Sequence, residues 1–431
     1  MPDESASAAD PLVPSAIAQA QVRLAAVVRR TPLERSERLQ TLVGVPVLLK
    51  REDMQECRSY KVRGAYNLIA SLTDAERARG VVCASAGNHG QGLAFACRAL
   101  RIRGRVYLPS NTPRQKRERI AAIGAEWVEL VIGGRTYDEA SAAAAADSAA
   151  TGAVAVHPFD DLRTIAGQGT VGSELLAQAT DQGEAISTLI VPVGGGGLLA
   201  GIATWVRAHA PQIRLVGAEP AGAASMRAAL AAGAPVRLDA FDTFVDGAAV
   251  GRVGEHSFAV VRQLVDEVVA VPEGAICTEM LDLYATEGVI AEPAGALATA
   301  ALRQLAAAGQ LESSDAGAVA CIVSGGNNDV SRYAEIVERS LLHEGLRHYF
   351  LVTFSQEPGA LRDFLDAVLV HGEDIVAFEY VKKNNRETGP ALVGIELEQA
   401  ADLPALLERL ASSPLEVEQI PPGSPLFTFL L

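Results

Sequence analysis

The sequence predicts an α/β protein with parallel β-sheets, followed by a small C-terminal domain of the element order βαββαβ. Three observations lead to this prediction. Short apolar runs alternate with Ala-rich helical stretches from about residue 15 to about residue 340, and glycines bound many of these runs, as is typical of parallel α/β layers. The pattern changes near Arg347 to an order that is ferredoxin-like. A chain of 431 residues is long enough for two or three domains.

The elements of the first part follow from periodicity and from glycine and proline signals. Residues 1–14 are expected to be disordered, and Ser15 is expected to cap a helix that runs through Val28. The first strand is expected over residues 45–49, where it ends in the charged segment 50–53. Further strands are expected at 80–83, 105–108, 127–131, 188–193, 213–218 and 319–323, and the Ala-rich segment 140–150 is interpreted as a helix.

Residues 347–431 are expected to form a separate domain. The pattern predicts a strand over 349–354, a turn at 356–359 and an amphipathic helix over 360–369. It then predicts a strand over 375–380, a polar turn at 382–390, a strand over 391–397, a helix over 403–410 and a strand over 415–420. This order is the βαββαβ order of a ferredoxin-like module.

Composition and charge argue against several classes of protein. The formal charge is −15 and no long basic run occurs, so binding to nucleic acid is not expected. No apolar stretch approaches the roughly 18–20 residues that a membrane span requires, and the first residues are polar and acidic, so we expect a cytoplasmic protein without membrane contact. The five cysteines are widely spaced and form no CxxC pair, which indicates neither disulfides nor a zinc site.

A run of glycines follows the strand expected over 188–193. Gly194, Gly195, Gly196 and Gly197 precede Leu198, and such a loop lets backbone N–H groups converge on an anion at a helix N-terminus. The run also fits a loose dinucleotide pattern, with Glu219 placed near where a ribose-binding acid would lie, so a dinucleotide-dependent oxidoreductase stays open. A Walker-type nucleotide site is excluded because no Lys-Ser/Thr pair follows the glycines.

Lysine is scarce in this chain, which makes Lys61 notable. Of the 37 basic residues only five are lysines, and none occurs between Lys116 and Lys382. A lysine that is kept where arginine otherwise serves can be needed as an amine, because a deprotonated amine forms an imine. Ser59 is a plausible N-cap that would place Lys61 in the first turn of a helix. Lys50 is the one rival, although an ordinary charge suffices there.

Two further segments follow expected strands and begin with serine. Ser85, Ala86, Gly87 and Asn88 follow the strand at 80–83, and their hydroxyl, amide and N–H groups could hold a carboxylate. His89, next to them, is more often a structural histidine than a catalyst. Ser324 opens the segment Ser-Gly-Gly-Asn-Asn-Asp after the strand at 319–323, which by itself is an ordinary turn. In open α/β sheets, ligands gather at such carboxyl ends of strands.

Taken together, these segments resemble the signatures of the fold-type-II pyridoxal-phosphate enzymes, in order and spacing, and that family has two open, twisted, parallel-sheet subdomains. Segments 31–33, 50–53, 165–170 and 292–296 resemble the serine/threonine dehydratases within it. Residues 349–361 and 391–397 resemble the ACT-like regulatory domain of the biosynthetic threonine dehydratases. The resemblance covers about residues 15–431. It implies a catalytic domain at 15–343, with a smaller subdomain at about 52–157 inserted in the larger, and a regulatory domain at 347–431.

The resemblance also implies roles for individual residues. Lys61 would bind pyridoxal phosphate covalently, Asn88 would donate to the 3′-oxygen of the cofactor, and Ser324 would face its pyridine nitrogen. The residues Gly194 to Leu198 would cradle the phosphate, and Ser85 to Asn88 would bind the carboxylate of the substrate. The implied reaction is the deamination of L-threonine to 2-oxobutanoate and ammonia, the committed step of isoleucine biosynthesis, with some activity on L-serine.

Alternatives within the family are a serine dehydratase and a serine or threonine racemase. In racemase-like relatives an Asp completes a cation site, but Ser225 stands in its place here, so no metal is expected. The resemblance further implies a homo-oligomer, a tetramer in this family, and an allosteric effect of isoleucine or valine at the C-terminal domain. Only a single ACT-like copy is present, which leaves the sign of that effect open.

Overall fold

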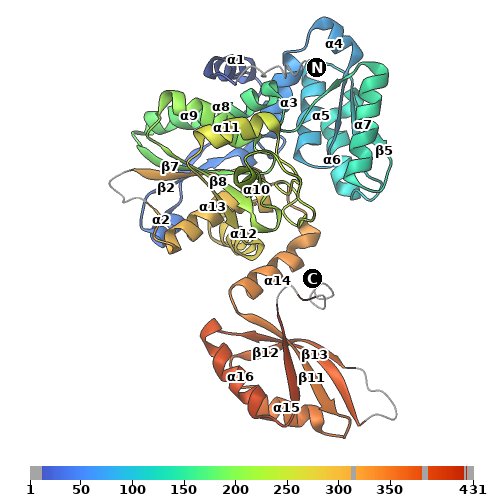
Figure 1. Ribbon diagram of the computed structural model, residues 1–431, viewed down its shortest axis with the longest axis vertical. Helices are drawn as coiled ribbons and strands as arrows, with labels where there is room; N and C mark the ends of the chain where they lie inside the picture. Colours follow the sequence, from blue (N-terminus) through green and yellow to red (C-terminus); the bar gives the residue numbers. More distant parts are fainter. Residues whose placement is uncertain (1–11, 312–316, 381–386, 422–423, 425–431) are drawn as a thin grey trace, which may run out of the picture. The chain divides into compact units, whose positions relative to one another are not determined.

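The computed structural model describes residues 12–311, 317–380, 387–421 and 424 (Figure 1). The chain folds into two compact units: one comprises the residues up to Glu273 together with Asp282–Asn328, and the other comprises Gly274–Leu281 together with the residues from Asp329 onward. The expectation of disorder for residues 1–14 falls mostly outside the described residues. Of the three that are described, Pro14 already belongs to a helix, so the disorder does not extend that far.

The first unit contains a six-stranded sheet in the order β1-β2-β10-β7-β8-β9, in which every neighbouring pair is parallel except β1 with β2. The expected strands in this sheet are confirmed to within two residues at most ends. The short β1 and the strand β9 were not predicted, because two of the three residues of β1 are charged and β9 begins with Glu267 at the edge of the sheet. The strands are β1 (Leu33–Arg35), β2 (Val47–Arg51), β7 (Ile186–Pro192), β8 (Arg214–Pro220), β9 (Glu267–Val271) and β10 (Ala318–Val323).

Helices cover both faces of this sheet. Helices α8, α9 and α11 lie on one side, and α2 and α13 lie on the other (Figure 1). The strands β7 and β10 are buried on both faces, which is why they are mostly apolar and do not alternate with polar residues, although β7 includes Ser187 and Thr188. The helices are α2 (Glu37–Val43), α8 (Leu162–Gln182), α9 (Gly197–His209), α10 (Ser225–Ala232), α11 (Glu255–Leu264), α12 (Glu273–Glu287) and α13 (Pro293–Ala307).

A second, four-stranded sheet of the same unit is parallel throughout, in the order β5-β4-β3-β6. Its strands all lie between β2 and β7 in the sequence. The Ala-rich segment is confirmed as the helix α7. The elements are β3 (Val81–Ala84), β4 (Gly104–Leu108), β5 (Val128–Ile132), β6 (Val154–Ala155), α3 (Lys61–Ala70), α4 (Asp74–Arg79), α5 (Asn88–Leu100), α6 (Arg114–Gly124) and α7 (Tyr137–Thr151).

The N-terminal helix α1 (Pro14–Leu24) departs from the prediction at both ends. Its N-cap is Val13, and Ser15 lies inside the helix rather than capping it. Pro14 occupies the first turn, where the missing N–H costs nothing, so the helix begins without a side-chain cap. The helix ends four residues before Val28, where the continued apolar pattern serves packing rather than helical hydrogen bonding.

The second unit contains the predicted βαββαβ order in one antiparallel sheet, β12-β13-β11-β14. The helices α15 and α16 pack on one face of it through a shared core that includes Phe350, Phe364 and Leu406. The polar turn expected at 382–390 lies partly outside the described residues, and its last residues belong to β13 instead. The elements are α14 (Tyr333–His343), β11 (Arg347–Ser355), α15 (Ala360–Val368), β12 (Glu373–Tyr380), β13 (Thr388–Leu397), α16 (Leu403–Ser412) and β14 (Glu416–Ile420).

Candidate active site

The glycine run forms the connection from β7 to α9. The strand ends at Pro192, and the helix begins at Gly197 with Gly196 as its N-cap. Gly196 has a φ of +91°, a conformation that L-residues with a side chain rarely adopt. The first N–H groups of α9 have no partner within the helix, and together with the helix dipole they form a site for an anion. The predicted strand, loop and helix are therefore confirmed.

The glycines of this loop also leave no room for side chains. A Cβ atom on Gly195 would lie 2.2 Å from the ring of Phe159, and one on Gly196 would lie 2.6 Å from Cε of Met226. A Cβ atom on Gly197 would lie 2.7 Å from the carbonyl oxygen of Phe159. The backbone is thus enclosed by protein where a side chain would project, which leaves its N–H groups as the polar surface that faces a ligand.

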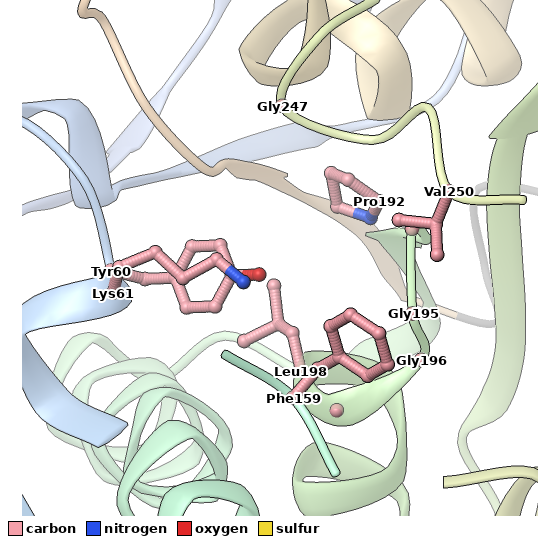
Figure 2. Close-up of a pocket in the computed structure, with 11 residues that line it drawn as sticks. Tyr60, Lys61, Phe159, Pro192, Gly195, Gly196, Leu198, Gly247 and Val250 are labelled. Carbon is pink, nitrogen blue, oxygen red and sulfur yellow. The ribbon is translucent and has the colours of Figure 1, made fainter. Parts of the chain in front are cut away.

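Lys61 lines the same pocket as this loop. Figure 2 shows the side chains of Tyr60 and Lys61 pointing toward Leu198 and the glycines. The ammonium group lies 5.2 Å from the centre of the Tyr60 ring, and Nζ donates to the carbonyl oxygen of Pro158 at 3.1 Å. Burial lowers the pKa of Lys61 to about 8, so the neutral, nucleophilic amine is more available near neutral pH than it is in an ordinary lysine. Among the described residues that line the pocket, Lys61 is the only charged one.

Lys61 is the first residue of α3, as expected, but the predicted cap is wrong. The N-cap is Tyr60, and no side chain caps the helix. Ser59 instead forms an isolated β-bridge with Gly325, and its buried hydroxyl makes no hydrogen bond within the described part of the chain. The bridge draws the start of α3 against the loop that follows β10, where the N–H of Tyr60 donates to the carbonyl oxygen of Ser324 at 3.1 Å.

Lys50, the other candidate for the imine-forming lysine, is fully engaged in hydrogen bonds away from the pocket. It is fully buried, and its Nζ donates to the carbonyl oxygen of Thr31 at 2.7 Å, to Glu174 at 2.6 Å and to Gln178 at 2.9 Å. These three acceptors use all three hydrogens of the ammonium group. Lys50 therefore serves as a structural cation and does not compete with Lys61 for a carbonyl ligand.

The segment Ser85 to Gly87 connects β3 to α5, and Asn88 is the first residue of that helix. Ser85 Oγ accepts from the N–H of Gly87 at 3.3 Å. His89 lies behind this loop, and its Nε2 lies 2.7 Å from the carbonyl oxygen of Val156, so Nε2 carries the proton. Burial lowers the pKa of His89 to about 3, so the ring is neutral, in agreement with the structural interpretation of this histidine.

Asn88 and the Ser324 loop meet around a buried carboxyl group. Asn88 Nδ2 donates to Glu292 Oε1 at 2.6 Å, and Asn88 Oδ1 accepts from Asn327 Nδ2 at 2.7 Å. Ser324 is buried, and its Oγ donates to the carbonyl oxygen of Ala294 at 3.0 Å. Glu292 occupies the N-cap position of α13 without a capping hydrogen bond from its side chain, and burial raises its pKa to about 7. The structure thus brings Asn88 and the Ser324 loop together across a large distance in sequence.

Glu219, the candidate ribose-binding acid, faces another helix. Its carboxylate oxygens accept from the N–H groups of Met226 at 2.8 Å and of Arg227 at 2.9 Å, at the start of α10. Burial raises the pKa of Glu219 to about 7. Because Glu219 is also fully buried, its carboxylate is not accessible to a ribose. In the described residues, no group of three or more His, Cys, Asp or Glu side chains could hold a metal ion.

Two residues that contact Lys61 or the glycine loop were not predicted from the sequence. Phe159 packs on Gly195, and Pro158 accepts from both Lys61 and Gln168 through its carbonyl oxygen. Both belong to the segment 157–161, which links β6 to α8 and ends in Asp161, the N-cap of that helix. The segment follows a strand and precedes a helix like the four that were singled out. The strand β6 has only two residues, however, and carried too weak a signal to mark it.

The residues present fit pyridoxal phosphate. The glycine loop offers backbone N–H groups to a phosphate, and the Lys61 amine of the same pocket, in its neutral form, can bind an aldehyde. In the described part of the chain no acidic side chain lines the pocket, so a phosphate meets no like charge from these residues. An adenine dinucleotide would need no amine in this position.

Comparison with known proteins agrees with this assignment. Residues 24–325 match the family described as pyridoxal-phosphate dependent enzymes, and residues 338–430 match the C-terminal regulatory domain of threonine dehydratase. The chain is 56% identical to the biosynthetic L-threonine dehydratase of Mycobacterium tuberculosis over 417 residues, which is 96% of this chain and 95% of the relative. The chain belongs to the threonine dehydratase family of pyridoxal-phosphate dependent enzymes.

Solved structures of the family share the fold of the first unit. The processed form of threonine deaminase isoform 2 from Solanum lycopersicum is 37% identical, with a TM-score of 0.70, and the match covers 77% of this chain and 95% of that one. Maize serine racemase is 34% identical, with a TM-score of 0.69, and the match covers 77% of this chain and 98% of the racemase chain. The fold-type-II assignment and the cofactor are therefore confirmed. No helix in the described residues is long and apolar enough to cross a membrane.

Proposed function

We propose that the chain catalyses the deamination of L-threonine to 2-oxobutanoate and ammonia with pyridoxal phosphate, the committed step of isoleucine biosynthesis. The observation that carries this function is the pocket that places the Lys61 amine and the Gly194–Leu198 loop together. The regulatory domain, matched over residues 338–430, distinguishes this function from that of a serine dehydratase or a racemase of the same fold. Relatives with the same two-part organisation are named biosynthetic threonine dehydratases.

We assign the roles of the site residues as follows. Lys61 holds the cofactor, the N–H groups of Gly194 to Leu198 bind its phosphate, Asn88 donates to its 3′-oxygen and Ser324 contacts its pyridine nitrogen. Ser85 to Asn88 bind the carboxylate of threonine. The support for these roles is the shared pocket of Lys61 and the loop, and the hydrogen bonds that link Asn88 to the Ser324 loop.

The bound cofactor supplies an electron sink for the carbanion that forms at Cα of the substrate. The residues of the chain supply the general base and orient the substrate. The amine of Lys61, with a pKa lowered to about 8, can take the proton from Cα as a general base. The loop 85–88 orients the carboxylate, and the enclosed pocket restricts access of water to the reacting atoms. The β-hydroxyl then leaves with a proton as water, and the resulting enamine tautomerises and is hydrolysed to 2-oxobutanoate and ammonia.

Substitution of Lys61 tests the assignment. Lys61→Ala is expected to abolish the visible absorption of bound cofactor and to leave less than about one thousandth of the activity, since the covalent attachment and the base are lost together. Lys382→Ala, a change of the same type in the regulatory domain, is the matched control and is expected to keep both. Borohydride reduction followed by peptide mapping locates the modified lysine, and modification of another lysine in the wild type contradicts the assignment.

Substrate preference is tested by release of ammonia and 2-oxo acid from L-threonine and from L-serine. We expect a higher kcat/KM for threonine, with some turnover of serine. Formation of D-amino acid as the main product would instead identify a racemase.

We also propose that the domain at 347–431 binds isoleucine or valine and changes the activity of the catalytic domain at 15–343, which includes the smaller subdomain at about 52–157. The proposed assembly is a homotetramer in the cytoplasm. The threonine assay with added isoleucine or valine tests the regulation, and light scattering tests the assembly. Equal activity with and without either amino acid contradicts an allosteric role.

A further inference from the structure

The amide of Asn88 is held by partners whose chemistry leaves it a single orientation. Asn327 Nδ2 donates to the carbonyl oxygen of Cys57 at 2.7 Å, and a carbonyl oxygen can only accept. The amide of Asn327 is therefore oriented with Nδ2 toward Cys57, and the same nitrogen donates its second hydrogen to Asn88 Oδ1 at 2.7 Å. Since Oδ1 faces Asn327, Nδ2 of Asn88 must face the opposite side.

Glu292 completes the arrangement on that opposite side. Its Oε1 accepts from Asn88 Nδ2 at 2.6 Å, and its Oε2 accepts from the backbone N–H of Asn327 at 3.2 Å. Asn88, Glu292 and Asn327 thus form a closed ring of hydrogen bonds, which we call the Asn88 clamp. Glu292 is 5% exposed, so water does not replace these bonds.

The clamp uses one hydrogen of Asn88 Nδ2 and leaves the other. In the described part of the chain this second N–H makes no hydrogen bond. We propose that Glu292 and Asn327 are positioning residues, which hold the Asn88 amide so that its remaining N–H is available to the 3′-oxygen of pyridoxal phosphate. This inference rests on the proposed function, and it assigns to Glu292 and Asn327 a role in the electronic state of the cofactor.

The clamp needs an acceptor with two oxygens at position 292. A glutamine offers one oxygen to two donors, so one N–H is lost whichever way its amide turns. Protonation of Glu292 has a similar effect, because the protonated oxygen becomes a donor. The charged groups that act on Glu292 are Asp246, Lys116 and Lys61, and the phenol of Tyr60 is also close enough to interact. The clamp is complete above about pH 7, where Glu292 is ionised, and weakens below it.

The test uses Glu292→Gln and Asn327→Asp in the full-length enzyme. The first variant removes an acceptor, and the second places a carboxylate against Asn88 Oδ1, which turns the amide around. Asn328→Asp is the matched control, since it makes the same change one residue away, where Nδ2 donates to the carbonyl oxygen of Ala291. The readouts are the Kd for pyridoxal phosphate from equilibrium dialysis, and the visible absorption maximum of the bound cofactor between pH 6 and pH 9.

We expect Glu292→Gln and Asn327→Asp each to raise the Kd about tenfold or more, as loss of a hydrogen bond to a charged group implies, and to shift the absorption maximum. The control stays within about twofold of the wild type. In the wild type the spectrum changes with a midpoint near pH 7, and Glu292→Gln loses this transition. Glu292→Asp keeps two acceptor oxygens and is expected to restore part of the wild-type spectrum.

A wild-type spectrum and Kd in both clamp variants overturn the inference, as does an equal effect of Asn328→Asp. A purely structural role would lower the melting temperature without moving the absorption maximum, which also overturns it. If Glu292→Gln does not fold, Asn327→Asp decides alone, because its side chain lies in a loop. Failure of the wild type to take up pyridoxal phosphate refutes the proposed function instead, and so the two failures are distinguishable.

Discussion

The helix that begins with Lys61 is anchored by a buried ion pair, and its loss is the perturbation that we consider first. Arg63 is 1% exposed and makes five hydrogen bonds: two to Glu52 at 2.7 and 2.8 Å, two to Glu174, and one to Thr170. Glu52 is fully buried and also accepts from Thr31 at 2.6 Å. Replacement of Arg63 by methionine leaves the Glu52 carboxylate buried without its cation.

Removal of one partner of a buried pair costs about 3–5 kcal/mol, since the remaining charge is uncompensated. With a urea dependence of about 3 kcal/mol per molar, Arg63→Met is expected to lower the unfolding midpoint by about 1–1.7 M. Arg114→Met is the control. Arg114 is 83% exposed and pairs with Glu118 four residues along α6, where such a pair contributes only about 0.3–0.5 kcal/mol.

The double variant Glu52→Gln with Arg63→Met removes both charges and is expected to recover part of the loss. The pH dependence follows from the same pair. Arg63 holds the pKa of Glu52 below its usual value, so the carboxylate contributes stability above the unfolded pKa of about 4.3 and loses it as the pH falls through the folded pKa. A midpoint for Arg63→Met no lower than that of Arg114→Met, or a double variant less stable than the single one, would refute the reasoning.

Three further predictions concern single residues. Gly196→Ala is expected to weaken cofactor binding about tenfold, because φ is +91° and the new Cβ would lie 2.6 Å from Met226; an unchanged Kd in a fluorescence titration contradicts this. In cofactor-free protein, acetylation of Lys61 is expected to have a midpoint near pH 8, well below the value of about 10.4 for an ordinary lysine, when followed by mass spectrometry. Phe354→Ala removes edge-to-face contacts with Phe364 and Phe378 and is expected to cost about 3–5 kcal/mol, seen as faster hydrogen exchange in the strands β11 to β14.

The fold could be predicted from the sequence wherever one physical signal dominated. The strand β10 is apolar throughout and β7 is mostly apolar, glycines lie near both ends of each strand, and each strand was placed to within two residues. The regulatory domain was found because its turns and alternating strands follow one another at short range. The strands β1 and β9 were not predicted. The strand β1 is only three residues long, and β9 begins with Glu267 and lies at the edge of its sheet.

The candidate site could be predicted from the sequence only in part. Lys61, the glycine loop and the Asn88 segment each carry a local signal, since each begins a helix. The Asn88 clamp carries no local sequence signal. Asn88 and Glu292 are 204 residues apart, and Asn88 and Asn327 are 239 residues apart, so that only the folded sheets bring them together. The cap of α3 was misassigned for a similar reason, because Ser59 is engaged by the distant Gly325 rather than by its own helix.

Gly325 shows why the loop after β10 needs a residue without a side chain. The bridge from Ser59 approaches this residue on one side, and a Cβ atom there would lie 3.2 Å from Cβ of Ser59 and 2.3 Å from Glu292 Oε1. The carbonyl oxygen of Gly325 accepts from the N–H of Glu292 at 3.1 Å. A single glycine therefore sets the distance between the start of the Lys61 helix and the acid that holds Asn88. A side chain at this position would separate the amine from the clamp even though it would touch neither Lys61 nor Asn88.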